Sequence, residues 1–351
     1  MEEYVGLDVS MEETSVCVMD TVGEVVWEGK VATEPGDLVR TLHLRAPAAV
    51  KVGLETGPLS TWLWHALREA QVPVVCLDAR HAQAALSMRI NKTDKNDAAG
   101  LAQLVRMGWY REVKVKQLAT HVEGALLASR ALLVRQRCEL ENQIRGLLKN
   151  FGLRVKATKG RAFGQSVAAL ADKQPVLREM VLALLAAWSS LRLQIAVLSR
   201  RVEQQAMGDP VCRRLMTMVG VGKVTALAFR AAIDDPGRFR HSADVGAYLG
   251  LTPRRYASGE IDRMGRISRC GDALTRSYLY EAANIMLTRS RGSNPLKAWG
   301  LKLAKRVGWK KARVALARKM AIVLHCMWRD GTDFGAPKVK AWATATQGKV
   351  A

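Results

Sequence analysis

The sequence predicts a chain of two parts: an α/β domain at the N-terminus, followed by a mainly helical and strongly basic remainder. Three observations support this prediction. Apolar and other side chains alternate along residues 4–10, as in a strand with one buried face. Two helical stretches near the middle of the chain carry leucine at every seventh position. The charge is uneven, because residues 1–150 contain 18 Lys and Arg against 19 Asp and Glu, whereas residues 151–351 contain 36 against 13.

The first strand carries one carboxylate. The alternation along residues 4–10 predicts that Asp8 projects from the face opposite the apolar side chains. The next apolar runs, residues 15–19 and 23–29, are separated by turn residues, which predicts an antiparallel meander. Ribonuclease-H-like and actin-like sheets begin in this way. Taken alone, Asp8 is better explained as an ordinary polar residue on an exposed sheet face, and the positions of three further acids change that interpretation.

Three further acids follow at the ends of predicted elements. Residues 50–54 form an apolar run that ends in Glu55, so Glu55 lies at the end of a strand. Asp94 and Asp97 are three residues apart and would share one face at the start of a helix, where the helix dipole favours their ionised form. The alternative is that Asp94 caps the helix and Asp97 is an ordinary acid of its first turn.

A ribonuclease-H-like sheet would bring these four acids together. Clustered carboxylates repel one another unless cations lie between them, so the sequence predicts a magnesium site, with Mn²⁺ as an alternative ion. Two such ions about 3.5–4 Å apart would activate an attacking oxygen and stabilise a leaving one in phosphodiester cleavage. The six cysteines are widely spaced and have no histidine at ligand spacing, which argues against zinc and against a disulfide framework.

The middle of the chain predicts a helical arm. One helix spans about residues 121–150 and a second spans about residues 176–205, and both carry leucine heptads typical of coiled coils. The linker between them, residues 152–164, is basic and contains glycine. We expect a two-helix hairpin that self-associates, and the alternative is an intramolecular hairpin without a partner.

The basic half contains a possible phosphate-binding turn. Residues 215–229 (LMTMVGVGKVTALAF) match a helix-hairpin-helix pattern, in which the amides at the start of the second helix hold a phosphate. Lys223 lies beside the turn and is expected to contact that phosphate. Residues 239–250 predict a helix with Ser242 as its cap. Basic amphipathic helices are predicted over residues 275–288 and 310–328, with their apolar faces in the core.

A polar, glycine-containing loop is predicted over residues 252–271. Ser258 in this loop precedes Gly259 and is surrounded by arginines, namely Arg254, Arg255, Arg263, Arg266 and Arg269. A serine in such a setting can attack a DNA phosphate and conserve the bond energy as a phosphoserine ester, while the guanidinium groups neutralise the developing charge. The alternative is that Ser258 is a turn serine. Competing hydroxyl groups belong to Ser268, Thr252 and Ser242.

The net charge of +22 predicts a nucleic-acid-binding surface. A ribosomal or membrane-surface protein would also be basic, so the charge alone names no activity. No apolar segment follows the acidic start of the chain, and polar residues interrupt the apolar residues 181–198. We therefore expect a cytoplasmic protein with no membrane partner.

The ordered motifs resemble a known family. GLDVS, GLETG, NKTDKNDA, VGVGKVTA, AYLGLTPRRYASG and GRISRCGD occur in the order found in the DEDD-type insertion-sequence transposases of the IS110 family, more specifically its second subgroup. The resemblance spans about residues 4–330. It implies a RuvC-like domain whose acids match Asp8, Glu55, Asp94 and Asp97. It also implies a C-terminal transposase domain whose serine matches Ser258.

The resemblance also implies partners. These recombinases use a non-coding bridge RNA that pairs with donor and target DNA, and they assemble as dimers of dimers in which acids and serine meet across protomers. The implied enzyme is bacterial, cytoplasmic and nucleoid-associated. The predicted function is therefore RNA-guided, magnesium-dependent cleavage and exchange of DNA strands through a phosphoserine intermediate.

The predicted organisation has four parts. Residues 1–118 form the RuvC-like domain, residues 119–207 the coiled-coil arm, residues 208–330 the transposase domain, and residues 331–351 a poorly ordered tail. Three other functions remain open. One is a RuvC-like junction resolvase that hydrolyses DNA without a covalent intermediate. The others are an actin-like or sugar-kinase ATPase, which would need further glycine-rich phosphate loops, and a non-enzymatic nucleic-acid binder.

Overall fold

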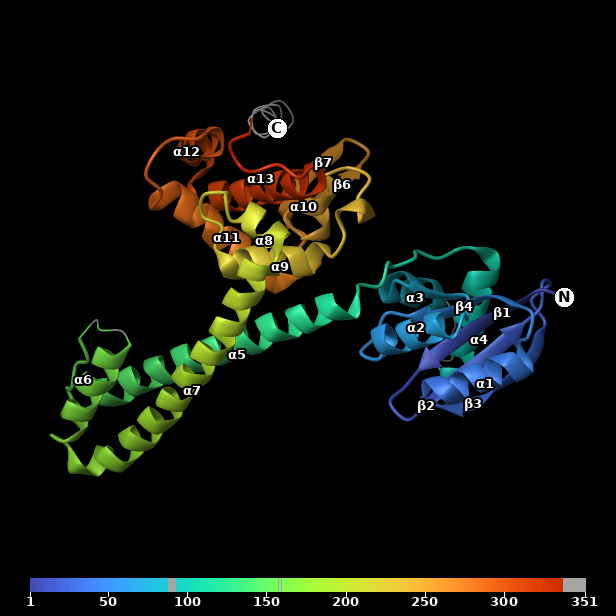
Figure 1. The fold of residues 1–351 in the computed structure, drawn as a ribbon, viewed down its shortest axis with the longest axis horizontal. Coiled ribbons are helices and arrows are strands. Elements are labelled where there is room, and N and C mark those ends of the chain that lie inside the picture. The colour runs from blue at the N-terminus through green and yellow to red at the C-terminus, as the bar shows by residue number, and fades with distance from the viewer. Residues whose placement is uncertain (88–92, 157, 159, 337–351) are drawn as a thin grey trace. The chain divides into compact units, whose positions relative to one another are not determined.

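The chain divides into two compact units, Met1–Leu118 and Ala119–Ala351, in a computed structural model (Figure 1). The structure describes residues 1–87, 93–156, 158 and 160–336. The start of the NKTDKNDA motif, residues 91–92, and most of the predicted tail, residues 337–351, lie outside the described residues. Each unit is described by itself.

The N-terminal unit alternates strands and helices. Its strands are β1 (Glu3–Val9), β2 (Glu13–Met19), β3 (Val25–Ala32), β4 (Ala49–Glu55) and β5 (Val74–Leu77). Its helices are α1 (Pro35–Arg45), α2 (Ser60–Glu69), α3 (Ala79–Leu86) and α4 (Asp94–Met107).

The five strands form one mixed sheet in the order β3-β2-β1-β4-β5. The first three strands are antiparallel neighbours, because short turns connect them. Strands β4 and β5 run parallel to β1, since each follows a helix that returns the chain to the same end of the sheet. This arrangement confirms the predicted meander and the ribonuclease-H-like α/β fold of the N-terminal unit.

Helices cover both faces of this sheet. Leu38 and Leu42 of α1 and Leu63 and Leu67 of α2 are buried against one face, in the same cluster as Leu7. Helix α4 lies against the other face, where Ala98 and Ala102 pack with Cys17 and Met19 of β2. The alternation of side chains along β1 therefore sends Leu7 toward α1 and α2, and Asp8 toward the side of α4.

A glycine permits α4 to lie directly on β1. A Cβ atom at Gly6 would be 2.1 Å from the carbonyl oxygen of Ala98 and 2.4 Å from the amide nitrogen of Ala102. Both atoms belong to the backbone of α4, so no side-chain rotation can relieve the overlap. Gly6 thus fixes how closely the helix approaches the strand that carries Asp8.

We expect Gly6→Ala to lower the free energy of unfolding by about 3 kcal/mol, at the upper end of the overpacking range, because α4 must move as a whole. Urea unfolding followed by circular dichroism measures this effect. Gly36→Ala is the matched control, since a Cβ atom there meets nothing within 4 Å. Equal stability of the two variants would contradict the direct contact between α4 and β1.

The C-terminal unit is mainly helical. Its helices are α5 (Leu118–Lys149), α6 (Arg161–Ala171), α7 (Pro175–Gly208), α8 (Pro210–Leu215), α9 (Lys223–Ile233), α10 (Asp244–Tyr248), α11 (Ala273–Thr288), α12 (Pro295–Val307) and α13 (Trp309–Asp330), with a 3₁₀ turn at Pro236–Arg238. Its two strands, β6 (Pro253–Ser258) and β7 (Ile261–Ile267), form an antiparallel hairpin. The expectation of a loop over residues 252–271 is therefore wrong.

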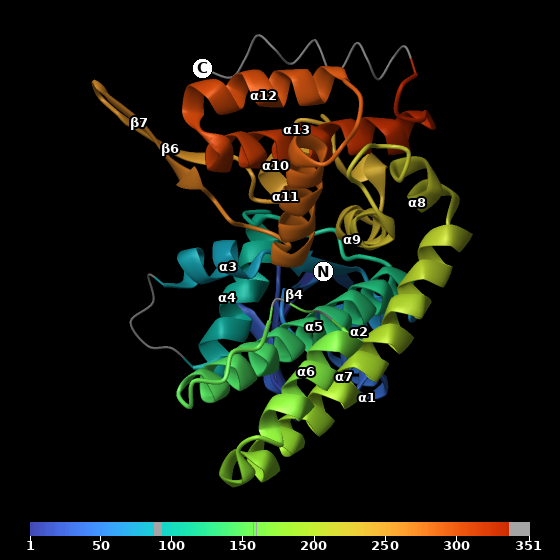
Figure 2. The same cartoon turned by 90° about the vertical axis from the view of Figure 1, so that its left-hand side faces the viewer.

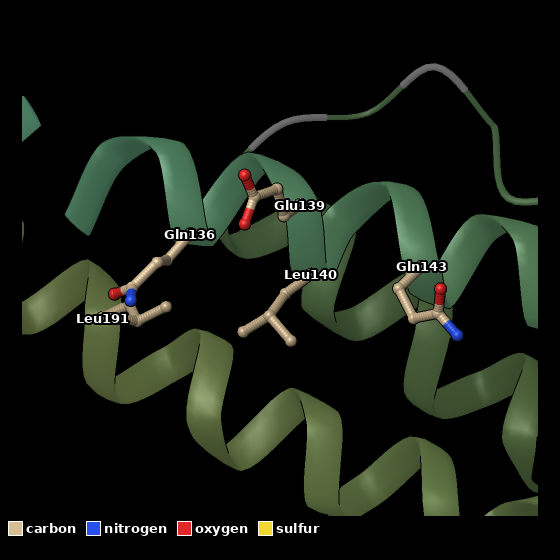
Figure 3. Close-up of a pocket in the computed structure, with 5 residues that line it drawn as sticks. All are labelled: Gln136, Glu139, Leu140, Gln143 and Leu191. Carbon is tan, nitrogen blue, oxygen red and sulfur yellow. The ribbon is translucent and has the colours of Figure 1, made fainter. Parts of the chain in front are cut away.

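The two predicted long helices are present as α5 and α7, but the linker between them is not wholly irregular. Helix α6 lies within it, and Phe163 and Val167 of α6 are buried against Val181 and Trp188 of α7. An open pocket lies between the long helices, where the heptad leucines Leu140 and Leu191 line it together with Gln136, Glu139 and Gln143 (Figure 3). The heptad stripes therefore do not close on each other at this position, and the coiled-coil self-association stays a prediction.

Helix α7 is more apolar than the polar residues within 181–198 indicate. Among the described residues it is the one helix long and apolar enough to cross a membrane by length and composition alone. That criterion is weak evidence for a span. Within the chain α7 packs against α6, and it leaves apolar side chains such as Leu193 and Val197 exposed.

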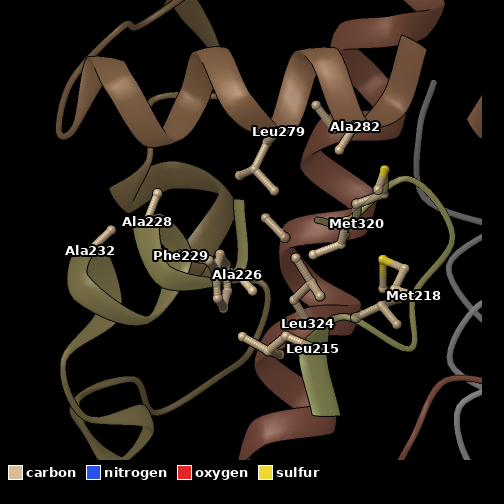
Figure 4. Close-up of a cluster of buried hydrophobic side chains, with 14 of the residues drawn as sticks. Leu215, Met218, Ala226, Ala228, Phe229, Ala232, Leu279, Ala282, Met320 and Leu324 are labelled. Carbon is tan, nitrogen blue, oxygen red and sulfur yellow. The ribbon is translucent and has the colours of Figure 1, made fainter. Parts of the chain in front are cut away.

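The rest of the C-terminal unit is a bundle around one apolar core. Leu215 and Met218 meet Phe229 of α9, and helices α11 and α13 contribute Leu279, Ala282, Met320 and Leu324 (Figure 4). The predicted helices 275–288 and 310–328 correspond to α11 and α13, so their apolar faces are core residues as expected. The predicted cap at Ser242 is wrong, because Ala243 precedes α10 and no side chain caps that helix.

Ser242 instead holds a buried histidine. The imidazole of His325 is fully buried, with Nε2 3.0 Å from the carbonyl oxygen of Pro236 and Nδ1 3.0 Å from the hydroxyl of Ser242. A carbonyl only accepts, so Nε2 carries the proton and Ser242 donates to Nδ1. Burial lowers the pKa of His325, because the charged imidazolium would lose its hydration.

We expect the C-terminal unit to lose stability below about pH 6.5, where the imidazole of the unfolded chain takes up a proton that folded His325 resists. Through this one group, the free energy of unfolding changes with pH by up to about 1.4 kcal/mol per pH unit. Urea unfolding at several pH values, on the wild-type protein and on His325→Gln, measures this contribution. If the free energy of unfolding has the same pH dependence in both proteins, His325 is not the group responsible.

Candidate active site

The register of the sheet places Asp8 beside Glu55. Gly6 pairs with Gly53 and Leu7 pairs with Leu54 across the parallel strands β1 and β4, and the next residues along are Asp8 and Glu55. Side chains one step beyond a paired position remain neighbours on the same face, and adjacent strands are about 4.8 Å apart. Both acids are half-buried. The structure thus brings together two of the four predicted acids on the face that α4 covers.

The first turn of α4 supplies the other two acids on the same side of the sheet. Thr93 precedes the helix, and its hydroxyl accepts a hydrogen bond of 3.2 Å from the amide of Asn96, so Thr93 rather than Asp94 is the cap. Tyr4 packs near Leu104 and Val105, whereas Gly6 meets Ala98. Moving along β1 toward Asp8 therefore approaches the helix start, where Asp97 is half-buried and Asp94 is exposed.

The acids share a face but do not surround a common point. Among the residues that the structure describes, no three Asp, Glu, His or Cys side chains are grouped closely enough to hold a metal ion. Carboxylates without a cation between them repel one another, so side chains directed at one ion would be unfavourable in the chain alone. The donor set is nevertheless chemically suited to Mg²⁺, which prefers carboxylate oxygens.

A lysine that the sequence analysis missed lies at this face. Lys30 of β3 pairs with Ser15 of β2, which pairs with Asp8, so one row crosses three strands. The Nζ atom of Lys30 is 3.5 Å from an oxygen of Asp94 and 3.7 Å from one of Glu13. Lys30 and Asp94 therefore form an exposed ion pair at this face of the sheet. Only the pairing of β2 with β3 could have revealed it, because no local motif marks this lysine.

Ser258 lies at the tip of the β6–β7 hairpin, which projects from the helices of its unit (Figure 2). It pairs with Ile261 across a turn that contains Gly259, whose φ of +56° is favourable for glycine. Every residue of β6 is exposed. The alternative hydroxyl groups are less accessible, since Ser268 and Thr252 are half-buried at the hairpin base and Ser242 contacts His325.

The predicted phosphate-binding side chains differ in their surroundings. Arg255 donates two hydrogen bonds of 2.8 Å to Asp262, and Lys223 is ion-paired with Glu203 of α7. Arg254 donates to the carbonyl oxygen of Ser268 at 3.3 Å. Arg263, Arg266 and Arg269 are exposed. The predicted cluster is thus partly neutralised by the chain itself.

Sequence comparisons identify the family. A family model described as "Transposase IS116/IS110/IS902 family" matches residues 212–297, and a model of the IS110-type DEDD transposases, described as "Transposase", matches residues 5–152. A "Probable family 20 transposase" of Pseudomonas aeruginosa is 30% identical over 244 residues, which are 68% of this chain and 72% of the relative. The chain belongs to the IS110 family of transposases.

Other similarities extend along most of the chain. The "Transposase for insertion sequence element IS1111A" of Coxiella burnetii is 27% identical over 334 residues, which cover 93% of this IS110-family chain and 89% of the relative. The solved structure of RuvC from Thermus thermophilus matches 32% of this chain and 99% of its own, with 16% identity and a TM-score of 0.25. As an IS110-family transposase, the chain is an enzyme that acts on DNA by cleavage and recombination.

Proposed function

We propose that this IS110-family transposase catalyses RNA-guided, magnesium-dependent cleavage and exchange of DNA strands through a phosphoserine intermediate. The observation that carries the proposal is the shared face of the N-terminal sheet. Asp8 and Glu55 are neighbours there, and α4 brings Asp94 and Asp97 to the same side. Four carboxylates on one face of a sheet serve no packing purpose, and a cation between them would offset their mutual repulsion.

The four acids would hold the metal. Magnesium bound to Asp8, Glu55, Asp94 and Asp97, as one or two ions, would activate the attacking oxygen and stabilise the leaving oxygen. Asp8 and Glu55 sit on neighbouring strands and so are held rigidly by the sheet. Asp94 comes from a helix end, where it forms an exposed ion pair with Lys30 of the sheet.

Ser258 is proposed as the nucleophile because it is the exposed serine at the hairpin tip. Its hydroxyl oxygen forms a bond to the phosphorus of a DNA phosphodiester, and the bond from phosphorus to the 3′ oxygen breaks. The serine proton leaves to solvent, and the leaving oxygen gains one. A 3′ hydroxyl of the exchanged strand then displaces Ser258, so the backbone is restored without ATP.

The proposed partners are donor DNA, target DNA and a non-coding bridge RNA. The excess of Lys and Arg in residues 151–351 provides the positive charge that such backbones require. A dimer of dimers is proposed for the assembly, and the exposed apolar side chains of α7 are suitable contacts between copies. The enzyme would act in the bacterial cytoplasm, at the nucleoid.

Two treatments test this proposal in one assay. The protein is purified with its bound RNA, mixed with labelled donor and target DNA, and strand exchange is followed with and without Mg²⁺. We expect exchange to stop after chelation and to return with Mg²⁺ or Mn²⁺, and to stop after ribonuclease treatment. Exchange that survives chelation would contradict the metal site, and exchange that survives ribonuclease would contradict RNA guidance.

A further inference from the structure

The β6–β7 hairpin has two chemically different faces. Tyr256 pairs with Arg263 and Ser258 pairs with Ile261, so these four side chains share one face, which we call the serine face. Arg255 and Asp262 lie on the opposite face, where they form an ion pair with two hydrogen bonds of 2.8 Å. The hairpin therefore separates a self-neutralised face from the face of Ser258.

The serine face carries an arginine and an aromatic ring without partners. Within the described residues, the Arg263 side chain makes no ion pair or hydrogen bond, and the Tyr256 side chain makes no ring contact or hydrogen bond. The Tyr256 side chain is 65% exposed. Both sides of the hairpin are exposed, so the Tyr256 ring is not buried and adds little to the stability of the fold. The ring is therefore available to a ligand.

The spacing along the hairpin suits a nucleic-acid strand. Tyr256 and Ser258 are two residues apart, about 6.6 Å along the strand, and Arg263 is directly across from Tyr256, with Cβ atoms about 5 Å apart. An arginine fork binds phosphate oxygens in a bidentate manner, and aromatic rings stack on unpaired bases. A phosphate at Ser258 would thus have its next nucleotide beside Tyr256 and Arg263.

We infer that Tyr256 and Arg263 form the binding platform for the DNA strand that Ser258 attacks. Arg263 binds the phosphate next to the cleaved bond, and Tyr256 stacks on the adjoining unpaired base. Both are positioning residues, because they hold the strand and take no part in bond making. The inference rests on the proposed role of Ser258, and it adds the residues that present the phosphate to it.

The test measures binding in the Ser258→Ala protein, where no covalent step takes place. The probe is single-stranded oligothymidylate with one 2-aminopurine, added to the full chain with its bound RNA. We expect Tyr256→Ala and Arg263→Ala each to weaken DNA binding about 10-fold, and Tyr256→Ala to reduce the quenching of 2-aminopurine. Tyr256→Phe keeps the ring and should behave as the parent.

Two controls lie away from the serine face. Arg178→Ala removes the same charge as Arg263→Ala from an exposed position on α7, and Met264→Ala removes an exposed side chain opposite the serine face, so both should change DNA binding less than 2-fold. Equal losses for Arg178→Ala and Arg263→Ala would overturn the inference, as would a loss in Tyr256→Phe equal to that in Tyr256→Ala. A reduced content of bound RNA in Arg263→Ala, with DNA binding unchanged, would also overturn it.

The inference and the proposed function can fail separately. If wild-type protein forms no covalent adduct but the serine face still binds DNA selectively, the platform stands and the phosphoserine step is wrong. If an adduct forms at the normal rate in Tyr256→Ala and Arg263→Ala, the platform is wrong and the phosphoserine step stands.

Discussion

Asp8→Asn is expected to slow strand exchange by about 10³-fold or more. The substitution removes a negative charge from the central strand of the sheet, and the proposed magnesium site requires that charge. Asparagine keeps the size of the side chain, and Asp8 is only half-buried, so the fold should be retained. The rate measured under saturating Mg²⁺, together with the thermal midpoint of the variant, separates a lost metal ligand from a lost fold.

The matched control for Asp8 is Asp37→Asn. Asp37 is also an acid of the N-terminal unit, but it lies on α1, which covers the opposite face of the sheet, where it pairs with Arg40. Its replacement should leave exchange unchanged within about 2-fold, as an exposed ion pair contributes little. A similar loss for both variants would show that net charge, and not the position of Asp8, governs the rate.

Ser258→Ala is expected to reduce strand exchange by about 10⁴- to 10⁶-fold, the range found when a covalent nucleophile is removed. The hairpin tip is exposed, so the missing hydroxyl leaves no buried group unpaired and stability should not change. Exchange assays with equal amounts of bound RNA in both proteins check the prediction.

The control for Ser258 is Ser268→Ala at the base of the same hairpin. Ser268 is half-buried, and its hydroxyl accepts a hydrogen bond from the amide of Cys270 at 3.4 Å. That contact is long and weak, so its loss should cost little stability and no activity. Normal exchange in Ser258→Ala together with lost exchange in Ser268→Ala would move the nucleophile to Ser268.

Local patterns were sufficient for the elements that carry the acids. Strand β1 follows from its alternation, and α4 from the apolar spacing after Asp97. What local patterns could not give is the pairing of β1 with β4, which makes Asp8 and Glu55 neighbours, because parallel register depends on contacts between distant segments. For the same reason Lys30 was missed, and an irregularity between Val18 and Met19 further obscures the register of β3.

The basic half was harder to interpret because its strands are not buried on either face. All residues of β6 are exposed, so no apolar alternation distinguishes it from a polar loop. Helix α12, in contrast, begins with a local cap signal that the sequence contains. Asn294 precedes Pro295, and the Asn294 side chain accepts a hydrogen bond of 2.9 Å from the amide of Lys297, as in a regular helix cap.

The most direct test of the proposed function is a search for a covalent bond between Ser258 and DNA. Protein with its bound RNA is mixed with Mg²⁺ and nicked, labelled donor and target DNA, quenched in detergent, and separated on a denaturing gel. The proposal predicts a heat-stable, protease-sensitive adduct that is absent in Ser258→Ala and in Asp8→Asn. Cleaved DNA without an adduct would contradict it, and would favour hydrolysis by the acidic site alone, as in a RuvC-like junction resolvase.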